Sequence, residues 1–321
     1  MRKKSVLLIL ILFGYSYCSF AQQPDTLIKK LDSLSVKADT LGKQKNNINP
    51  QAYTGRTNFT FSSYFILLGS DLKQEVTSAF HWGKKGWATF GSFVLAEGGL
   101  AFLDKPIQRN AFSFRNNHAS ISKVSGYVTN FGGAYEVYTL AAFGAYGLIF
   151  KSDKVKTTTL LATQAYITGG AMESVLKFLS GRQRPEYYSL SSPVPSPRFH
   201  DPFSTGKDIN GKTLNSSFPS GHTTVAFAAA TVFAVEYKNV PAIPIIAYTS
   251  ATLIGLSRIT ENKHWATDVL AGAVLGYFTG RQVVNNYHRY ATLKSPKSKR
   301  TISFNLQYNF GQVMPGIVYS F

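Results

Sequence analysis

The sequence predicts an all-α protein, an antiparallel helical bundle with a functional site at one end, followed by a small C-terminal β-hairpin. Long runs of apolar and small residues recur through residues 58–285, and their lengths are those of helices rather than strands. Near the C-terminus the pattern changes to strict apolar–polar alternation, which is typical of a half-buried strand. A hydrophobic share of 44% in 321 residues is sufficient for a large core.

Residues 1–21 have the three parts of a secretory signal peptide: a basic start, an apolar run and a small-x-small cleavage site that ends at Ala21. A lipoprotein signal would use Cys18 instead, but bulky Tyr17 stands where a small residue is expected. The sequence therefore predicts export to the cell envelope. Residues 22–57 are polar throughout and predict a flexible leader.

The helices of the bundle are expected within residues 58–285. Proline at 106 is expected to end one of them. Residues 107–123 are polar and basic and predict a surface connection with some helix, and residues 181–218 predict a long irregular rim or lid. The expected helices are Tyr64–Leu68 continuing toward Val76, Gly86–Leu103, Val124–Phe131, Val137–Phe150, Thr158–Leu179, Thr223–Glu236, Ala242–Leu256 and Trp265–Val283.

The C-terminal part divides into two segments. Residues 286–300 are basic and predict a linker or a patch at a membrane surface. Residues 301–321 alternate and contain a turn at Gly311, which predicts two strands of a hairpin packed on the bundle or on a partner. One hairpin is too little to close a membrane barrel.

Three short motifs carry the residue types of a catalytic site. Each alone has an ordinary structural explanation: basic residues complement the end of a helix, and a histidine four residues before an aspartate is often a surface contact. If the last four helices alternate in direction, however, all three motifs meet at one end of the bundle. The motifs are Lys177 with Arg184-Pro185 after six further residues, Pro219-Ser220-Gly221-His222, and Ser257-Arg258 followed by His264 and Asp268.

The assembled set has a coherent chemistry. Three cations together with the N–H groups of Gly221 and His222 would bind a tetrahedral oxyanion and stabilise its five-coordinate transition state. A carboxylate bonded to one ring nitrogen of His264 would leave the other nitrogen nucleophilic, and His222 could protonate the leaving oxygen. Neither a metal nor a cofactor is expected, because no cluster of metal-ligating side chains is evident in the sequence.

These motifs resemble the three-part signature of the type 2 phosphatidic acid phosphatase family. The superfamily also includes bacterial non-specific acid phosphatases and vanadium haloperoxidases. The resemblance implies that His264 is the nucleophile, Asp268 its partner and His222 the general acid. It also implies a set of phosphate-binding residues, namely Lys177, Arg184, Ser220, Gly221 and Arg258.

The net charge of +18 indicates anionic partners, and export disfavours nucleic acid among them. The resemblance and the apolar helices favour a membrane-bound enzyme whose site faces the periplasm. Its expected substrate is a phosphorylated lipid such as phosphatidate, phosphatidylglycerophosphate, a polyprenyl pyrophosphate or a lipid A phosphate. Three alternatives stay open: a soluble periplasmic acid phosphatase, a vanadate-dependent haloperoxidase, and a non-enzymatic envelope protein that binds anionic lipid.

Overall fold

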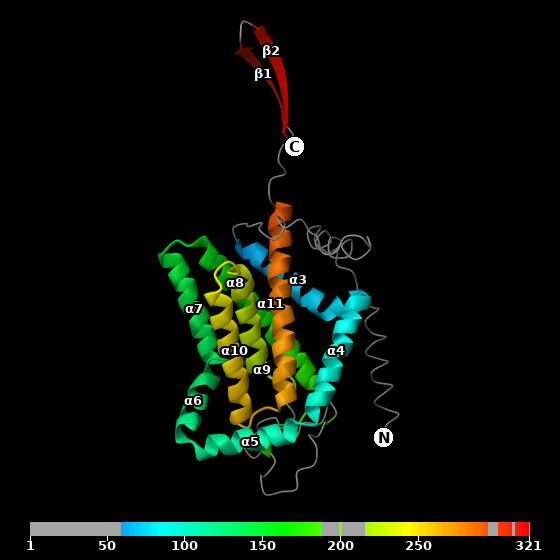
Figure 1. Ribbon diagram of the computed structural model, residues 1–321, viewed down its shortest axis with the longest axis vertical. Coiled ribbons are helices and arrows are strands. Elements are labelled where there is room, and N and C mark those ends of the chain that lie inside the picture. The colour runs from blue at the N-terminus through cyan, green and yellow to red at the C-terminus, as the bar shows by residue number, and fades with distance from the viewer. Residues whose placement is uncertain (1–58, 188–198, 201–215, 295–300, 310–311, 321) are drawn as a thin grey trace. The chain divides into compact units, whose positions relative to one another are not determined.

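A computed structural model describes residues 59–187, 199–200, 216–294, 301–309 and 312–320. The all-α class is confirmed, since the described residues form nine α-helices and two short 3-10 helices ahead of the C-terminal segment (Figure 1). The helices are α3 (Phe61–Thr77), η2 (Ser78–His81), α4 (Lys84–Ala101), α5 (Asp104–Asn117), α6 (Ala119–Asn130), α7 (Ala134–Ile149), α8 (Asp153–Ser180), η3 (Pro185–Tyr187), α9 (Gly221–Glu236), α10 (Ala242–Thr260) and α11 (Ala266–Lys294).

Helices α8 to α11 form the centre of the bundle and alternate in direction (Figure 1). At one end, the N–H of Ser220 donates to the carbonyl of Asp268 at 2.9 Å, which places the starts of α9 and α11 side by side. At the other end, Glu236 of α9 bonds His288 of α11 at 2.6 Å. Helices α9 and α11 are therefore parallel, and the connections through α8 and α10 return the chain to the first end.

A line of glycines lets α9 and α11 approach at backbone distance. A Cβ added at Gly272, Gly276 or Gly280 would lie 2.6, 2.2 or 2.4 Å from a carbonyl oxygen of α9 or of its N-cap residue. The spacing of four residues puts all three glycines on one face of α11, as in closely packed helix pairs generally. The α9–α11 seam thus sets the distance between two segments that carry site residues.

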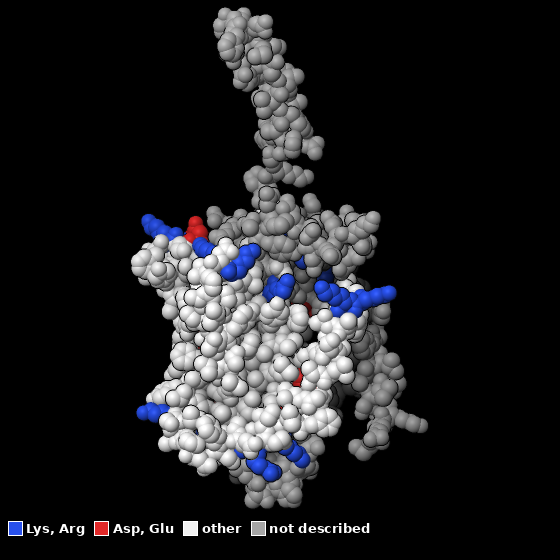
Figure 2. All heavy atoms as spheres, viewed as in Figure 1, with Lys and Arg blue, Asp and Glu red and all other residues white. Residues whose placement is uncertain are grey.

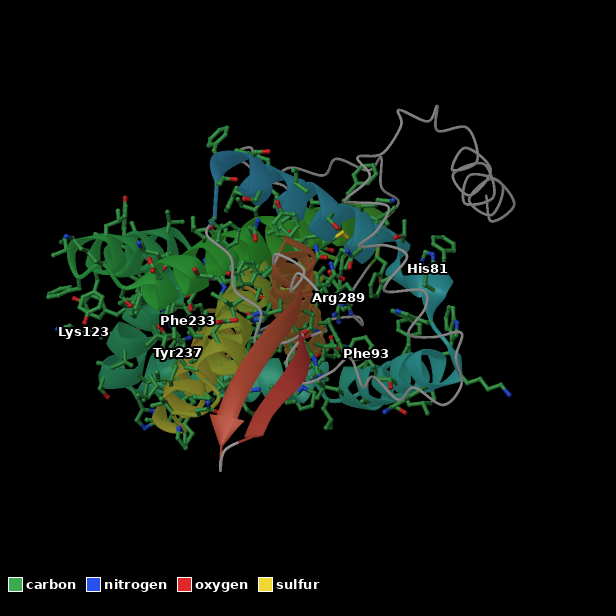
Figure 3. The ribbon with its side chains drawn as sticks, turned by 90° about the horizontal axis from the view of Figure 1, so that it is seen from above. His81, Phe93, Lys123, Phe233, Tyr237 and Arg289 are labelled. Carbon is green, nitrogen blue, oxygen red and sulfur yellow. The ribbon has the colours of Figure 1, made fainter. Side chains whose placement is uncertain are left out.

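Two aromatic side chains, Phe233 of α9 and Tyr237 directly after it, lie side by side in the view along the bundle (Figure 3). The rings of Phe233 and Tyr237 stack with centroids 6.5 Å apart. The ammonium of Lys154 lies 4.4 Å from the centroid of the Tyr237 ring, a cation–π contact that ties the start of α8 to the end of α9.

The structure adds to the sequence expectation at two helix boundaries. The helix expected to end before Pro106 does end, at Ala101, but Pro106 lies in the first turn of the next helix, α5, where a proline loses no helical hydrogen bond. As a result, most of the expected polar connection at 107–123 is helical, in α5 and α6. The chain instead bends by 59° between α4 and α5.

Helix α11 extends to Lys294, well past its expected end at Val283. The extension includes part of the segment expected as a basic linker. Its physical reason is a continued buried face, because Tyr287, Tyr290 and Ala291 follow Val283 and Val284 at helical spacing and all are at most 1% exposed.

The described backbone after residue 300 forms two antiparallel strands, β1 (Thr301–Asn309) and β2 (Gln312–Ser320), with Thr301 opposite Ser320. The half-buried face expected of this hairpin stays a prediction. The expected signal peptide and leader, most of the long loop and residues 295–300 of the linker lie outside the described residues.

Large apolar side chains are exposed over much of the bundle surface. In Figure 2 the face in view is almost free of charged residues between Lys and Arg side chains at its upper and lower parts. Among the described residues, α10 is long and apolar enough to cross a membrane, and the bent pair α4 and α5 together pass the same test. Exposed members include Trp87, Leu95, Tyr138, Leu148, Ile149, Phe178, Ile245, Ile246 and Leu253.

Candidate active site

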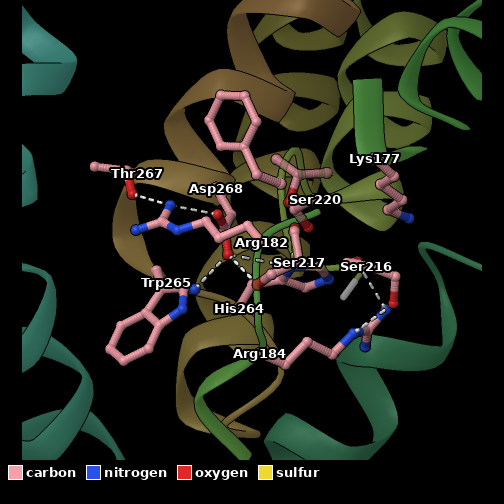
Figure 4. Close-up of polar contacts among 12 residues, drawn as sticks. Lys177, Arg182, Arg184, Ser216, Ser217, Ser220, His264, Trp265, Thr267 and Asp268 are labelled. Atoms are coloured by element: carbon pink, nitrogen blue, oxygen red, sulfur yellow. Dashed lines mark hydrogen bonds and ion pairs between the residues drawn. The ribbon is translucent and has the colours of Figure 1, made fainter. Parts of the chain in front are cut away.

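The structure brings the three motifs together at the end of the bundle where α9 and α11 begin. Lys177 lies in the last turn of α8, Arg184 just beyond it, and Arg258 in the last turn of α10. His264 precedes the first residue of α11, and Asp268 lies in its first turn. Lys177 and Arg184 lie to one side of His264 in Figure 4, with Arg182 and Trp265 to the other.

Lys177 is held over the start of α9. Its ammonium pairs with Glu173 at 2.7 Å, one helical turn earlier. A Cβ added at Gly221 would lie 2.8 Å from a carboxylate oxygen of Glu173 and 3.0 Å from the Lys177 nitrogen. A side chain at 221 would therefore displace this ion pair, which packs directly on the first turn of the helix.

The two arginines are each oriented by a neighbouring hydroxyl. The Nε of Arg184 donates to the Ser216 hydroxyl at 3.1 Å. Arg258 donates to the Thr129 hydroxyl of α6 at 2.6 Å, while its Nε is buried without a partner among the described residues. Thr129 lies outside the motifs and carried no signal in the sequence that could have identified it.

The start of α9 keeps its first N–H groups open. Ser220 is the N-cap residue, but its side chain makes no capping bond to the described backbone. It instead accepts a hydrogen bond from the Thr223 hydroxyl at 2.9 Å. Because the first N–H groups of a helix have no intrahelical acceptor, those of α9 are available to an anion, and the helix dipole favours it.

His264 is oriented differently from the sequence expectation. Its Nδ1 lies 2.8 Å from the carbonyl oxygen of Ser217, but 3.6 Å from the nearer carboxylate oxygen of Asp268. A carbonyl only accepts, so Nδ1 carries the proton and Nε2 carries the lone pair. The expected tautomer results, but Ser217 rather than Asp268 makes the bond to the ring.

Asp268 acts on the backbone around His264. One of its oxygens accepts from the N–H of Trp265 at 2.8 Å and from the Ser217 hydroxyl at 2.5 Å. The first of these bonds is the backbone half of a capping box, in which the third helical residue satisfies the N-cap N–H. Asp268 therefore fixes both the start of α11 and the residue that orients His264.

Burial and positive charge keep both site histidines neutral. Burial lowers the pKa of His264 well below its ordinary value, and the nearby charges of Arg184, Arg258 and Lys177 lower it further. Burial, followed by the same three cations, lowers the pKa of His222 to about 3. Because the same three cations lower the pKa of both histidines, they lie close to both rings, as at a site that binds an anion.

His222 packs against the α6–α7 turn. A Cβ added at Gly133 would lie 3.2 Å from its Nε2, and one added at Gly132 would lie 2.9 Å from its Cβ. Two adjacent glycines in a turn were visible in the sequence, but nothing local connected them to a histidine about ninety residues later.

Comparisons with known proteins agree with the motifs. Residues 158–291 match the family model described as the PAP2 superfamily. A lipid A 1-phosphatase of Porphyromonas gingivalis is 46% identical over 79 residues, which cover 24% of this chain and 18% of that protein. The probable lipid phosphate phosphatase 4 of Arabidopsis thaliana is 33% identical over 131 residues, covering 35% of this chain and 41% of that protein.

A solved structure, a transmembrane PAP2 type phosphatidylglycerolphosphate phosphatase from Bacillus subtilis, is 24% identical with a TM-score of 0.46 and covers 61% of this chain and 92% of that chain. The matched helical region, residues 158–291, belongs to the PAP2 superfamily. It spans less than half the length of the two curated relatives named above.

Proposed function

We propose that the protein is a lipid phosphate phosphatase that works through a phosphohistidine on His264. The observation that carries the proposal is the orientation of this ring: Nδ1–H is bonded to the Ser217 carbonyl, which leaves the Nε2 lone pair free. The cations on both sides of the α9 start supply the binding site for the phosphate. The relatives that the chain matches include a lipid A 1-phosphatase and a probable lipid phosphate phosphatase.

The reaction proceeds in two displacements. Nε2 of His264 attacks phosphorus while the bond to the alkoxide oxygen breaks, and the N–H groups of α9 with Lys177, Arg184 and Arg258 stabilise the equatorial oxygens. His222 donates a proton to the leaving oxygen. In the second step His222 removes a proton from water, the water oxygen attacks phosphorus, and the bond to Nε2 breaks with release of inorganic phosphate.

His222 must be protonated for the first step, although the unliganded site holds its pKa at about 3. The three cations responsible for part of that shift are those proposed to bind the substrate. A phosphate dianion between them cancels their field at His222, so substrate binding raises the pKa of the ring. Substrate binding therefore favours the protonated form of the general acid by removing the cations' share of the shift, while the share due to burial remains.

The surface supports a lipid substrate. The exposed apolar side chains on α4, α7 and α10 fit contact with acyl chains, and α10 can span a bilayer by length and composition. We propose membrane attachment with the site at the periplasmic side. Sodium carbonate washing of envelopes tests this, because a soluble acid phosphatase would be released and the proposed protein would stay with the lipid.

The experiment that tests the activity is phosphate release in detergent from phosphatidate, phosphatidylglycerophosphate, a polyprenyl pyrophosphate, lipid A and para-nitrophenyl phosphate. His264→Gln is expected to abolish release, whereas His288→Gln, which changes another buried histidine at the far end of α11, should retain it. Release should also continue in EDTA. Full activity of His264→Gln, or halide oxidation with vanadate in place of phosphate release, would contradict the proposal.

A further inference from the structure

A buried polar network lies behind His264 and includes residues that no motif contains. At its centre is Arg182, which is 4% exposed. Its guanidinium donates to Asp268 at 2.6 Å and to Asp104 at 2.7 Å, and both carboxylates are fully buried. It also donates to the Thr267 hydroxyl at 2.6 Å. The guanidinium group of Arg182 therefore links the segment after α8 to the start of α5 and to the first turn of α11.

Ser217 connects this network to the histidine through all three of its polar groups. Its N–H donates to the carbonyl of Arg182 at 2.9 Å. Its hydroxyl donates to Asp268 at 2.5 Å, and its carbonyl accepts from Nδ1 of His264 at 2.8 Å. Arg182 thus holds Ser217 twice, directly by its backbone and indirectly by the carboxylate that its side chain positions.

Asp104 contributes from a part of the chain outside the family match. One of its oxygens accepts from the Thr267 N–H at 3.0 Å, and the other accepts from the Thr267 hydroxyl at 2.7 Å. It therefore caps the first turn of α11 from the start of α5, and it shares the charge of Arg182 with Asp268. This buried carboxylate belongs to the first residue of α5, just after the bend between α4 and α5.

We infer that Asp104, Arg182 and Ser217 are positioning residues that hold His264 in its reactive tautomer and in line with the phosphate. The inference rests on the proposed function, which it deepens. None of the three needs to touch the substrate. Each is fixed by at least two hydrogen bonds, and together they surround the carbonyl that decides which ring nitrogen is nucleophilic.

The kinetic test compares Asp104→Asn and Ser217→Ala with the wild-type protein on dioleoyl phosphatidate in detergent micelles. Loss of ring alignment should lower kcat by about 10- to 100-fold. KM and the inhibition constant of inorganic phosphate should change by less than about threefold, because the phosphate-binding cations are untouched. Glu236→Gln is the matched control, since it neutralises a buried carboxylate of the same bundle at the end remote from His264.

A second readout is independent of turnover. In protein labelled with ¹⁵N-histidine, the His264 signals, assigned by their absence in His264→Gln, should show Nδ1–H alone in the wild type. Both variants should show exchange between the two tautomers, and Glu236→Gln should not. Unchanged kcat and an unchanged tautomer in folded Asp104→Asn and Ser217→Ala would overturn the inference. Absence of phosphate release by the wild type would instead refute the proposed function, while the tautomer measurement would still decide the positioning.

Discussion

Replacing Gly272 by alanine tests whether the α9–α11 seam sets the geometry of the site. The added Cβ would lie 2.6 Å from the carbonyl oxygen of Ser220. A separation of about 3.2 Å would still be tighter than most Cβ contacts, so the two backbones must move apart by at least about 0.6 Å at this point. Ser220 is the N-cap of α9, and Asp268 lies one turn before Gly272, so the movement separates the proposed phosphate site from the proposed nucleophile, His264.

The geometry yields two expected magnitudes. Overpacking of this kind destabilises by about 1–3 kcal/mol, of which the higher helix propensity of alanine restores about 1 kcal/mol. Displacements of about 1 Å reduce catalytic rates by about 100-fold, so a shift of about 0.6 Å should lower kcat by about tenfold. The loss of activity should therefore exceed what a modest loss of stability explains.

Gly280→Ala provides the control on the same seam. Its Cβ would lie 2.4 Å from the carbonyl of Ala228, a more severe clash placed two turns farther from the site. Both variants are compared by thermal unfolding in detergent and by phosphate release from phosphatidate. Gly280→Ala should be destabilised at least as much yet keep kcat within about twofold. Equal losses of kcat in the two variants, or none in Gly272→Ala, would refute the reasoning.

Three other predictions follow from the site. His222→Ala should lower kcat on an alkyl phosphate far more than on para-nitrophenyl phosphate, whose leaving group needs no proton; equal losses would remove His222 as general acid. Arg258→Lys keeps the charge but loses the planar donor held by Thr129, so competition by inorganic phosphate should weaken by about tenfold. Because the folded protein keeps the pKa of His264 well below 6.5, the unfolded chain alone takes up a proton as the pH falls below 6.5, and the free energy of unfolding decreases. Unfolding of His264→Gln should therefore depend less on pH between 6.5 and 5, by up to about 1.4 kcal/mol per pH unit, and an unchanged slope would contradict the shifted pKa.

Much of the site could be predicted because its residues lie in short motifs at helix ends. Lys177, His222 and Arg258 each stand within a few residues of a helix terminus that the hydrophobic pattern marks. Alternating helix directions then place those termini at one end of the bundle. Anion binding that depends on charged side chains and on the N–H groups at a helix start can therefore be predicted from the sequence.

The partner of His264 was beyond sequence reasoning. Asp268 stands at the helical spacing for a side-chain contact, yet its carboxylate is taken by Trp265, Ser217 and Arg182. The Nδ1–H of His264 instead donates a hydrogen bond to the backbone carbonyl of Ser217. Every residue has a backbone carbonyl, so a sequence motif cannot identify this partner.

The sequence by itself determined the helical class, the family motifs and the residue types that can bind and attack a phosphate. The tertiary structure alone decided how these residues are held. Asp104 and Arg182 are 78 positions apart, yet their side chains form a buried hydrogen bond beside the α4–α5 bend. Gly272 permits the contact that sets the spacing of α9 and α11. Such contacts join distant segments, and their energy comes from burial and close packing rather than from any local pattern.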